Sequence, residues 1–507
     1  MFDRNSFRPQ LERLGDRINP ADNVWLGPID SFTTANYWSL QRLPLPDDTL
    51  VFRAPASGQG NPPLPPTPGS TASVTFASLT PPPPYAPETK DTYAGVRIEG
   101  GYTGTLTIPF DLKFGGYTQE CGNTSTPGTN VTVTSTFSWT GGNLNTSSTA
   151  GEYRIQTPLG VIDPNGNMVG TGSTIAIQKN AASQLGSSLQ VKPGTIDLTN
   201  VVQIIVDDAC RINLNPAPKK PSDPPTIPGE IVLNSNPATP DEDGTVYVRR
   251  GGYCEIKADS RPPANTDLAR VTFSGSSAQL RNDGIVYVQD RAWLKFAPAA
   301  GTTGGIRQTD GLAPIPPRMS IQAGCVITCT GQANVRILVG TLKLEELWAS
   351  GQPVANQPAV TIEAACNTPA VTIGANAILT REDPTPQVPV KLNIKGAATV
   401  SLQCDGTLEL YAKKSEYLND KITTDGRVVF GSAAKIGMKW FNNNESFPVY
   451  DPPPWTLIES TYVDLGGVLT AISGNPTFIY LPLNPPYELL VAGVSSDNKK
   501  YQVQPNS

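Results

Sequence analysis

The chain of 507 residues is long enough for several ordinary domains or for one elongated repeat array, and its 46 glycines and 50 prolines disfavour a helical fold. It contains no histidine, which excludes Ser–His–Asp and Cys–His nucleophilic sites and the commonest metal ligand. Its formal net charge is −6, no basic stripe is visible in the sequence, and no apolar run is long enough to predict a membrane-spanning helix.

The first part of the chain predicts a leader-like segment followed by an N-terminal cap. Residues 1–22 lack the apolar stretch of a conventional secretory signal. Residues 23–95 contain Trp25 and Trp38, and a short strand expected near residues 72–79. Pro-rich segments at 62–68 and 81–87 flank that strand and predict loops. We therefore expect residues 23–95 to form a Trp-containing cap.

A short pattern then recurs, in which a glycine, usually followed by Thr, opens a strand with apolar residues two positions apart. Its copies are Gly104–Ile108, Gly194–Leu198, Gly244–Val248, Gly340–Leu344 and Gly406–Leu410, with looser copies at Gly284–Val288 and Gly426–Phe430. Glycine permits the corner where the chain turns. The alternation that follows places apolar side chains on one face and polar ones on the other. A wall one strand thick with a dry interior needs this arrangement.

These patterns predict an all-β fold, a right-handed parallel β-helix (β-solenoid) with N-terminal and C-terminal caps. The solenoid is expected over residues 96–450, in rungs of roughly 20 residues plus insertions, one of them the Pro-rich segment at 215–228. Residues 451–507 are expected to form a C-terminal β cap. The alternative is a string of β-sandwich domains. The almost uninterrupted succession of strands favours the solenoid.

The seven cysteines predict buried structural side chains rather than a metal or redox site. They lie at positions 121, 210, 254, 325, 329, 366 and 404, without a CxxC pair. On one strand, Cys325 and Cys329 would lie roughly 13 Å apart, too far for a disulfide. We expect them to act as small apolar residues in the wall.

The sequence contains one candidate carboxylate pair and two candidate calcium sites. Asp207 and Asp208 follow the apolar strand 201–206, and adjacent strand residues point to opposite faces, so a turn is favoured over a catalytic pair. Asp163 with Asn165, and Asp241 with Asp243, place oxygen ligands at alternate positions as in calcium loops. The stretch from Asp163 to Asn165 is also a turn sequence. No catalytic residue and no cofactor other than calcium is predicted.

Two N-terminal stretches and one later rung resemble known bacterial proteins. Residues 8–17, followed by Asn19-Pro20-Ala21, are similar to the leader of large extracellular proteins of planctomycete-type bacteria. Residues 25–27, 36–38 and 46–52 resemble the opening segment of surface β-solenoids related to autotransporter passengers, and 137–144 resembles one of their rungs. This resemblance implies export to the cell surface or beyond.

We therefore expect a non-catalytic, extracellular or cell-surface, structural or adhesive β-solenoid protein of a bacterium. Its expected partners are a cell surface, matrix or polysaccharide, and not nucleic acid. The alternative is a carbohydrate-active β-helix, similar to a polysaccharide lyase or hydrolase and using a carboxylate pair or calcium. A carbohydrate-binding β-helix without turnover is a further alternative.

Overall fold

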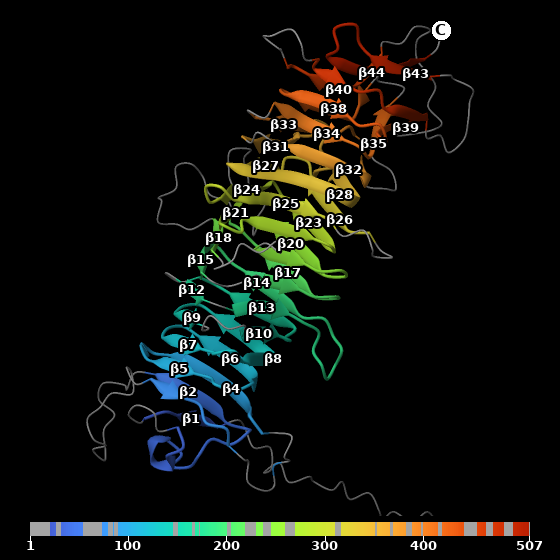
Figure 1. Cartoon of the computed structure of the whole chain (residues 1–507). Coiled ribbons are helices and arrows are strands. Elements are labelled where there is room, and N and C mark those ends of the chain that lie inside the picture. Colours follow the sequence, from blue (N-terminus) through green and yellow to red (C-terminus); the bar gives the residue numbers. More distant parts are fainter. Residues whose placement is uncertain are drawn as a thin grey trace, which may run out of the picture.

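A computed structural model shows an elongated molecule built from stacked coils of parallel β-strands (Figure 1). It describes residues 21–26, 32–53, 73–79, 85, 90–145, 151–164, 168–171, 173–199, 204–217, 230–236, 245–258, 269–309, 316–349, 352–365, 369–381, 388–396, 399–413, 418–440, 454–462, 470–480 and 490–505. Within these ranges the helical element is a short 3-10 turn, η1 (Ala35–Tyr37).

Each coil has three faces, which we call face 1, face 2 and face 3 in chain order. Faces 1 and 2 belong to one continuous sheet, and face 3 is a second sheet. Face 1 contains β10 (Gly151–Ile155), β13 (Ser173–Ile177), β16 (Ile204–Val206), β19 (Val246–Val248), β22 (Gln279–Asn282), β25 (Thr303–Gln308), β34 (Val400–Cys404), β38 (Arg427–Phe430) and β41 (Ile472–Ser473). Face 2 contains β1 (Asp22–Val24), β2 (Thr49–Arg53), β11 (Leu159–Ile162), β14 (Ser188–Val191), β17 (Arg211–Leu214), β20 (Tyr253–Lys257), β23 (Ile285–Gln289), β26 (Arg318–Gln322), β35 (Thr407–Lys413), β36 (Leu418–Asn419), β39 (Lys435–Trp440) and β42 (Thr477–Tyr480).

Some strands continue from face 1 into face 2, and face 3 closes the coil. The continuous strands are β4 (Thr92–Glu99), β6 (Leu112–Gln119), β8 (Asn130–Trp139), β28 (Gln332–Glu345) and β32 (Val371–Arg381). Face 3 contains β3 (Val74–Thr75), β5 (Thr105–Thr107), β7 (Asn123–Ser125), β9 (Asn143–Asn145), β12 (Met168–Thr171), β15 (Gly194–Thr199), β18 (Ile231–Asn236), β21 (Ala269–Gly275), β24 (Ala292–Pro298), β27 (Val326–Cys329), β31 (Val360–Ala364), β33 (Lys391–Lys395), β37 (Lys421–Thr424), β40 (Trp455–Ser460), β43 (Leu490–Val494) and β44 (Lys500–Pro505). A separate hairpin joins β29 (Trp348–Ala349) and β30 (Gln352–Pro353).

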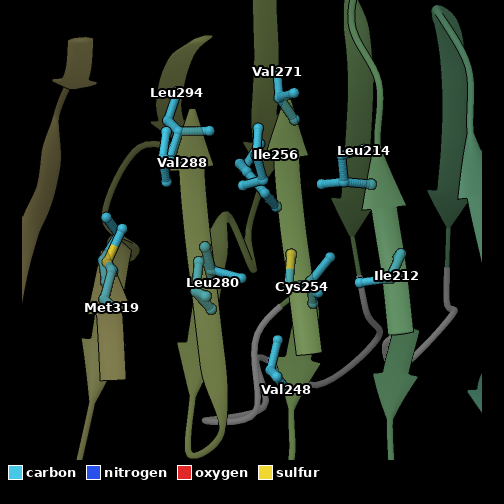
Figure 2. Packing of buried hydrophobic residues seen from close by; sticks show 14 of the residues in the cluster. Ile212, Leu214, Val248, Cys254, Ile256, Val271, Leu280, Val288, Leu294 and Met319 are labelled. Carbon is cyan, nitrogen blue, oxygen red and sulfur yellow. The ribbon is translucent and has the colours of Figure 1, made fainter. Parts of the chain in front are cut away.

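The core is a column of inward side chains that repeat at the same register position in successive coils. On face 3, six such residues are Ile231, Val271, Leu294, Ile327, Ile362 and Ile394, and all are fully buried. Figure 2 shows Val271 and Leu294 packing with side chains such as Ile256 and Val288 from face 2. The inward residues of the glycine-led strands, among them Leu342 and Leu344, are buried as expected.

The corner between faces 1 and 2 requires glycine and buried amides. Gly340, in the middle of β28, has φ of 76°, and a Cβ there would lie 2.1 Å from the carbonyl oxygen of Pro317. The buried Gln308 amide donates to the carbonyl oxygens of Val339 (2.7 Å) and Pro317 (3.2 Å), and accepts from Asn282 Nδ2 (2.8 Å). These side chains satisfy backbone groups that the turn leaves without a ladder partner.

The two ends of the column differ from its middle. At the N-terminal end, Trp25 and Trp38 lie in edge-to-face contact with ring centroids 5.1 Å apart, and Trp38 also packs against Phe52. At the other end, β44 pairs antiparallel with β40, and β43 pairs antiparallel with β44. The stacking of parallel strands changes there into an antiparallel arrangement.

The all-β, parallel β-helix predicted from the sequence is confirmed. Leu112 pairs with Val131 and Val131 with Tyr153, so these coils advance by 19 and 22 residues, close to the expected 20. Later coils are longer: Val428 pairs with Ile472, 44 residues on. Parallel pairing extends on both sides of residues 96–450, from β1 to β42. The right-handed coiling stays a prediction, and the Pro-rich segments fall largely outside the described residues.

Replacement of one residue of the inward column tests its contribution to stability. We expect Leu294→Ala to destabilise the protein by about 2–5 kcal/mol, because it removes buried methyl groups and leaves a cavity. Lys295→Ala, one residue along the same strand and on the outward side, is the control and should change stability by less than about 0.5 kcal/mol. Chemical unfolding followed by circular dichroism measures both. Equal effects of the two changes would contradict the inward column.

Candidate binding surface

Arginine and tyrosine side chains gather on the outside of faces 1 and 2, across five successive coils. On face 1, Tyr247, Arg281, Arg307 and Arg336 occupy one outward register position in four adjacent strands. On face 2, Arg211 pairs in register with Tyr253. The arginine–tyrosine face, as we call this surface, comprises Arg211, Tyr247, Arg249, Arg250, Tyr253, Arg281, Tyr287, Arg307, Arg318 and Arg336.

The face 2 part of this surface is a stack of rings and guanidinium groups. The Arg211 guanidinium lies 4.3 Å from the centroid of the Tyr253 ring. The Tyr253 and Tyr287 rings are 5.3 Å apart, and the Arg318 guanidinium lies 5.1 Å from the Tyr287 ring. Burial raises the pKa of Tyr253 to about 12, so its hydroxyl is protonated at neutral pH. The stack holds these side chains in fixed positions, since each contacts the next coil.

The face 1 part is anchored by a buried carboxylate. The Tyr247 hydroxyl donates to Asp283 Oδ2 (2.8 Å), and Arg281 Nε lies 3.3 Å from the same oxygen. The Arg281 guanidinium also lies 4.4 Å from the centroid of the Tyr247 ring. Burial and the neighbouring Asp283 raise the pKa of Tyr247 to about 12. Further along, Arg307 Nη1 donates to the backbone and side-chain oxygens of Asn334 (2.9 and 2.7 Å).

A hollow of about 460 Å³ lies at the corner between the two parts. Its lining consists of Asp208, Arg250, Gly251, Asp283, Gly284, Ile285 and Pro316. Gly251 has φ of 75°, and a Cβ there would lie 2.0 Å from Asp208 Oδ1, so glycine allows the carboxylate to approach the backbone. The volume falls within the range of about 300–1,000 Å³ usual for small-ligand pockets.

The two aspartates expected at a turn take different partners. β16 ends at Val206, and the backbone turns directly after it, with Ala209 at φ of 58°. Asp208 accepts from Lys179 Nζ (2.6 Å) in the preceding coil, whereas Asp207 accepts from Arg249 Nη1 (2.9 Å) in the next coil. The turn predicted after this strand is confirmed. The sequence did not indicate that Asp283, rather than Asp207, shares the hollow with Asp208.

Of the four calcium candidates, one lies within the described residues. Asp163 follows β11, is partly exposed and accepts from Lys192 Nζ (2.8 Å) in the next coil. Asn165, Asp241 and Asp243 lie outside the described residues. Among the residues that the structure describes, no three Cys, Asp or Glu side chains are grouped as metal ligands would be. Calcium binding therefore stays a prediction.

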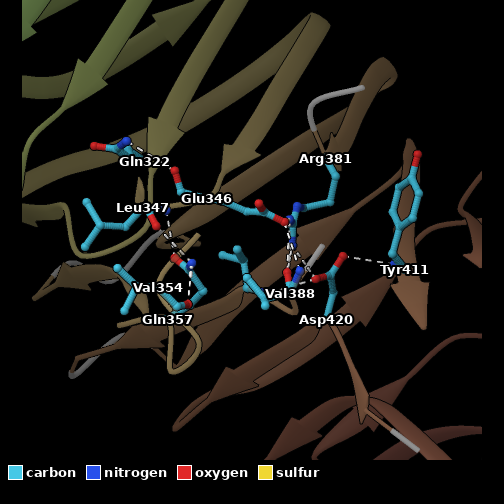
Figure 3. Close-up of polar contacts among 10 residues, drawn as sticks. Gln322, Glu346, Leu347, Val354, Gln357, Arg381, Val388, Tyr411 and Asp420 are labelled. Carbon is cyan, nitrogen blue, oxygen red and sulfur yellow. Dashed lines mark hydrogen bonds and ion pairs between the residues drawn. The ribbon is translucent and has the colours of Figure 1, made fainter. Parts of the chain in front are cut away.

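A buried ionic cluster lies inside the C-terminal half of the solenoid (Figure 3). Arg381 donates to Asp420 Oδ1 (2.7 Å) and Glu346 Oε1 (2.8 Å), and the three side chains are at most 5% exposed. The same carboxylates accept from the backbone N–H groups of Val388 and Val390. Burial raises the pKa of Asp420, and Arg381 opposes that shift. These bonds join three coils. Solvent barely reaches the cluster, so we assign it a role in stability rather than in ligand binding.

Six of the seven cysteines lie within the described residues, and Cys366 lies outside them. Cys210, Cys254, Cys325, Cys329 and Cys404 are buried, and Cys121 is partly buried. The thiol of Cys325 is free, so it forms no disulfide with Cys329. Burial raises the pKa of Cys325 and of Cys404 to about 12.

A scan against protein-family models, a search of curated proteins and a search of solved structures found no match to this chain. The resemblance to planctomycete-type surface proteins stays a prediction. In the part of the chain that the structure describes, no helix is both long enough and apolar enough to cross a membrane.

Removal of the guanidinium in the buried ionic cluster should be strongly destabilising. We expect Arg381→Met to cost about 3–5 kcal/mol at pH 8, because two carboxylates stay buried without their counter-charge. The folded-state pKa of Asp420 then rises further above its unfolded value. As the pH falls from the folded-state pKa of Asp420 to its unfolded-state pKa, the variant therefore gains stability, since the folded state binds the proton more tightly.

Unfolding measured at pH 8 and pH 5 tests this expectation. The control is Arg336→Met, which removes an exposed guanidinium from the outer wall and should show a small effect at both values. If the destabilisation by Arg381→Met did not shrink toward pH 5, the expected cost of burying the unpaired carboxylates would be contradicted.

The buried thiols should resist alkylation in the native protein. With a pKa of about 12, the thiolate of Cys325 or Cys404 is only about one part in 10⁴ of the total at pH 8. We expect iodoacetamide to leave both residues unmodified in the folded protein and to modify both after denaturation. Peptide mass spectrometry measures each site, and stoichiometric labelling of the folded protein would refute the expected burial.

Proposed function

We propose that this protein is a non-catalytic, extracellular or cell-surface structural or adhesive protein whose solenoid wall is its binding surface. The observation that carries the proposal is the arginine–tyrosine face, an ordered array of cationic and aromatic side chains on the outside of five consecutive coils. Exposed arginine and tyrosine are the residue types enriched in binding surfaces.

The architecture supports a structural role. Each coil hydrogen-bonds to the coils before and after it along all three faces, and the inward column is continuous. Such a stack is quasi-one-dimensional: it lengthens without enlarging its cross-section and presents an extended surface to a partner. Residues 8–17 are similar to the leader of extracellular planctomycete-type proteins, and residues 25–27, 36–38 and 46–52 to the opening segment of surface solenoids. Both similarities support an extracellular location.

The contacts of the carboxylates in the hollow support binding rather than catalysis. Asp208 is paired with Lys179, and Asp283 accepts from Tyr247 and lies beside Arg281. Hydrolysis of a glycosidic bond requires two carboxyl groups that face the scissile bond, one of them as an acid. Here each carboxylate already binds a donor from a neighbouring coil, which fits a positioning role for both.

The second candidate is a carbohydrate-active β-helix, and one observation favours it. Asp208 and Asp283 come from different coils and line the same hollow. A polysaccharide chain lying over the corner would contact both carboxylates. This candidate requires turnover, whereas the first requires retention of the polysaccharide without turnover.

Retention and turnover can be measured on the same samples. Beads coated with the full chain are exposed to a panel of immobilised polysaccharides and bacterial cells, and the supernatants are assayed for reducing ends and unsaturated uronates. We expect retention of the beads without product. Product that disappears in Asp208→Asn and Asp283→Asn but persists in Asp207→Asn would overturn the proposal in favour of the enzyme, since Asp207 does not line the hollow.

A further inference from the structure

We propose that the arginine–tyrosine face binds an acidic polysaccharide with a carboxylate on each sugar, lying along the solenoid axis over the corner hollow. This inference rests on the proposed function, since it names the ligand class of the same wall. Its starting point is the register of the face, in which cationic side chains from separate coils stand one above another.

The spacing of the positive charges matches such a ligand. Adjacent strands of a sheet lie about 4.8 Å apart, so Arg281, Arg307 and Arg336 start from backbone positions that repeat at this interval. A sugar residue in an extended polysaccharide advances by a similar distance. Five coils therefore offer about 19 Å of wall, on which successive carboxylates meet successive guanidinium groups.

The aromatic rings indicate a sugar rather than a simple anion. Tyr253 and Tyr287 are half-buried, their rings contact each other in a tilted arrangement, and they lie beside Arg211 and Arg318 on the same wall. The ring faces are covered by Arg211, Arg318 and each other, so a sugar would contact the apolar edges of the rings. The guanidinium groups beside them bind carboxylates in a bidentate manner. The hollow adds Arg250 together with the exposed carboxylate of Asp208, which can accept hydrogen bonds from sugar hydroxyls.

The mixture of charges favours a polysaccharide over a nucleic acid. Asp207, Asp208 and Asp283 lie between the arginines, and the whole chain carries a net charge of −6. A nucleic acid, with closely spaced phosphates along its whole length, is bound by surfaces of high positive charge. A polysaccharide with one carboxylate and several hydroxyl groups per sugar suits a surface that alternates cations, anions and rings.

Binding of polygalacturonate to the immobilised full chain tests the inference, with its fully methyl-esterified form and single-stranded DNA as comparison ligands. We expect polygalacturonate to bind, more weakly as salt is added, because exposed charges are screened within about 10 Å at 0.1 M salt. The esterified polymer has the same sugars without the charge and should bind much more weakly.

Two sets of variants locate the binding site. The triple variant R211Q/R250Q/R336Q removes three exposed guanidinium groups from the face and should raise the Kd about tenfold. The control K113Q/K391Q/K395Q removes three exposed charges elsewhere and should leave the Kd within about twofold. Tyr253→Ala should weaken binding, whereas Tyr253→Phe keeps the ring and should not. Circular dichroism melting curves confirm that each variant is folded.

Each outcome decides between distinct conclusions. Equal binding of the esterified polymer, or equal effects of the two triple variants, would overturn the proposed site. Tighter binding of single-stranded DNA would replace the ligand class by nucleic acid. Absence of polygalacturonate binding, with beads still retained on cells, would overturn this inference and leave the proposed function standing. Absence of retention on every surface would overturn the proposed function itself.

Discussion

The structure depends on the stacking of inward aliphatic side chains at one register position from coil to coil. Ile231, Val271, Leu294 and their successors on face 3 form a ladder in which each residue buries the next. The parallel hydrogen bonds between strands hold that register, since a slip by one residue would turn every apolar side chain outward. A coil by itself buries little, so each coil owes its stability to its neighbours.

The constraint that fixes the core also fixes the outer wall. When Val246, Leu280 and Ile306 align inside face 1, the residues that follow them, Tyr247, Arg281 and Arg307, necessarily align outside. Side chains far apart in the sequence thereby become neighbours about 4.8 Å apart. The fold therefore produces a linear array wherever successive coils carry the same kind of residue at one outward register position.

This explains which features the sequence predicts. The glycine-led strands identify the core because glycine and the alternation of apolar residues are local signals, and Leu342, Leu344, Leu408 and Leu410 are buried as expected. The arginine–tyrosine face has no local signal. Tyr247, Arg281, Arg307 and Arg336 are separated by 34, 26 and 29 residues, because successive coils contain different numbers of residues. Only the strand register reveals the array.

Polar side chains in the interior bond to groups at the corners and are not part of the inward column. Gln308 and Asn282 satisfy carbonyl groups where faces 1 and 2 meet, and Arg381 joins carboxylates and backbone from three coils. The protein carries a net negative charge and can still attract anions locally, because salt at about 0.1 M screens exposed carboxylates farther than about 10 Å away. An anion at the arginine–tyrosine face responds to the guanidinium groups within that distance. The net charge of the chain therefore does not decide which ligands its surface binds.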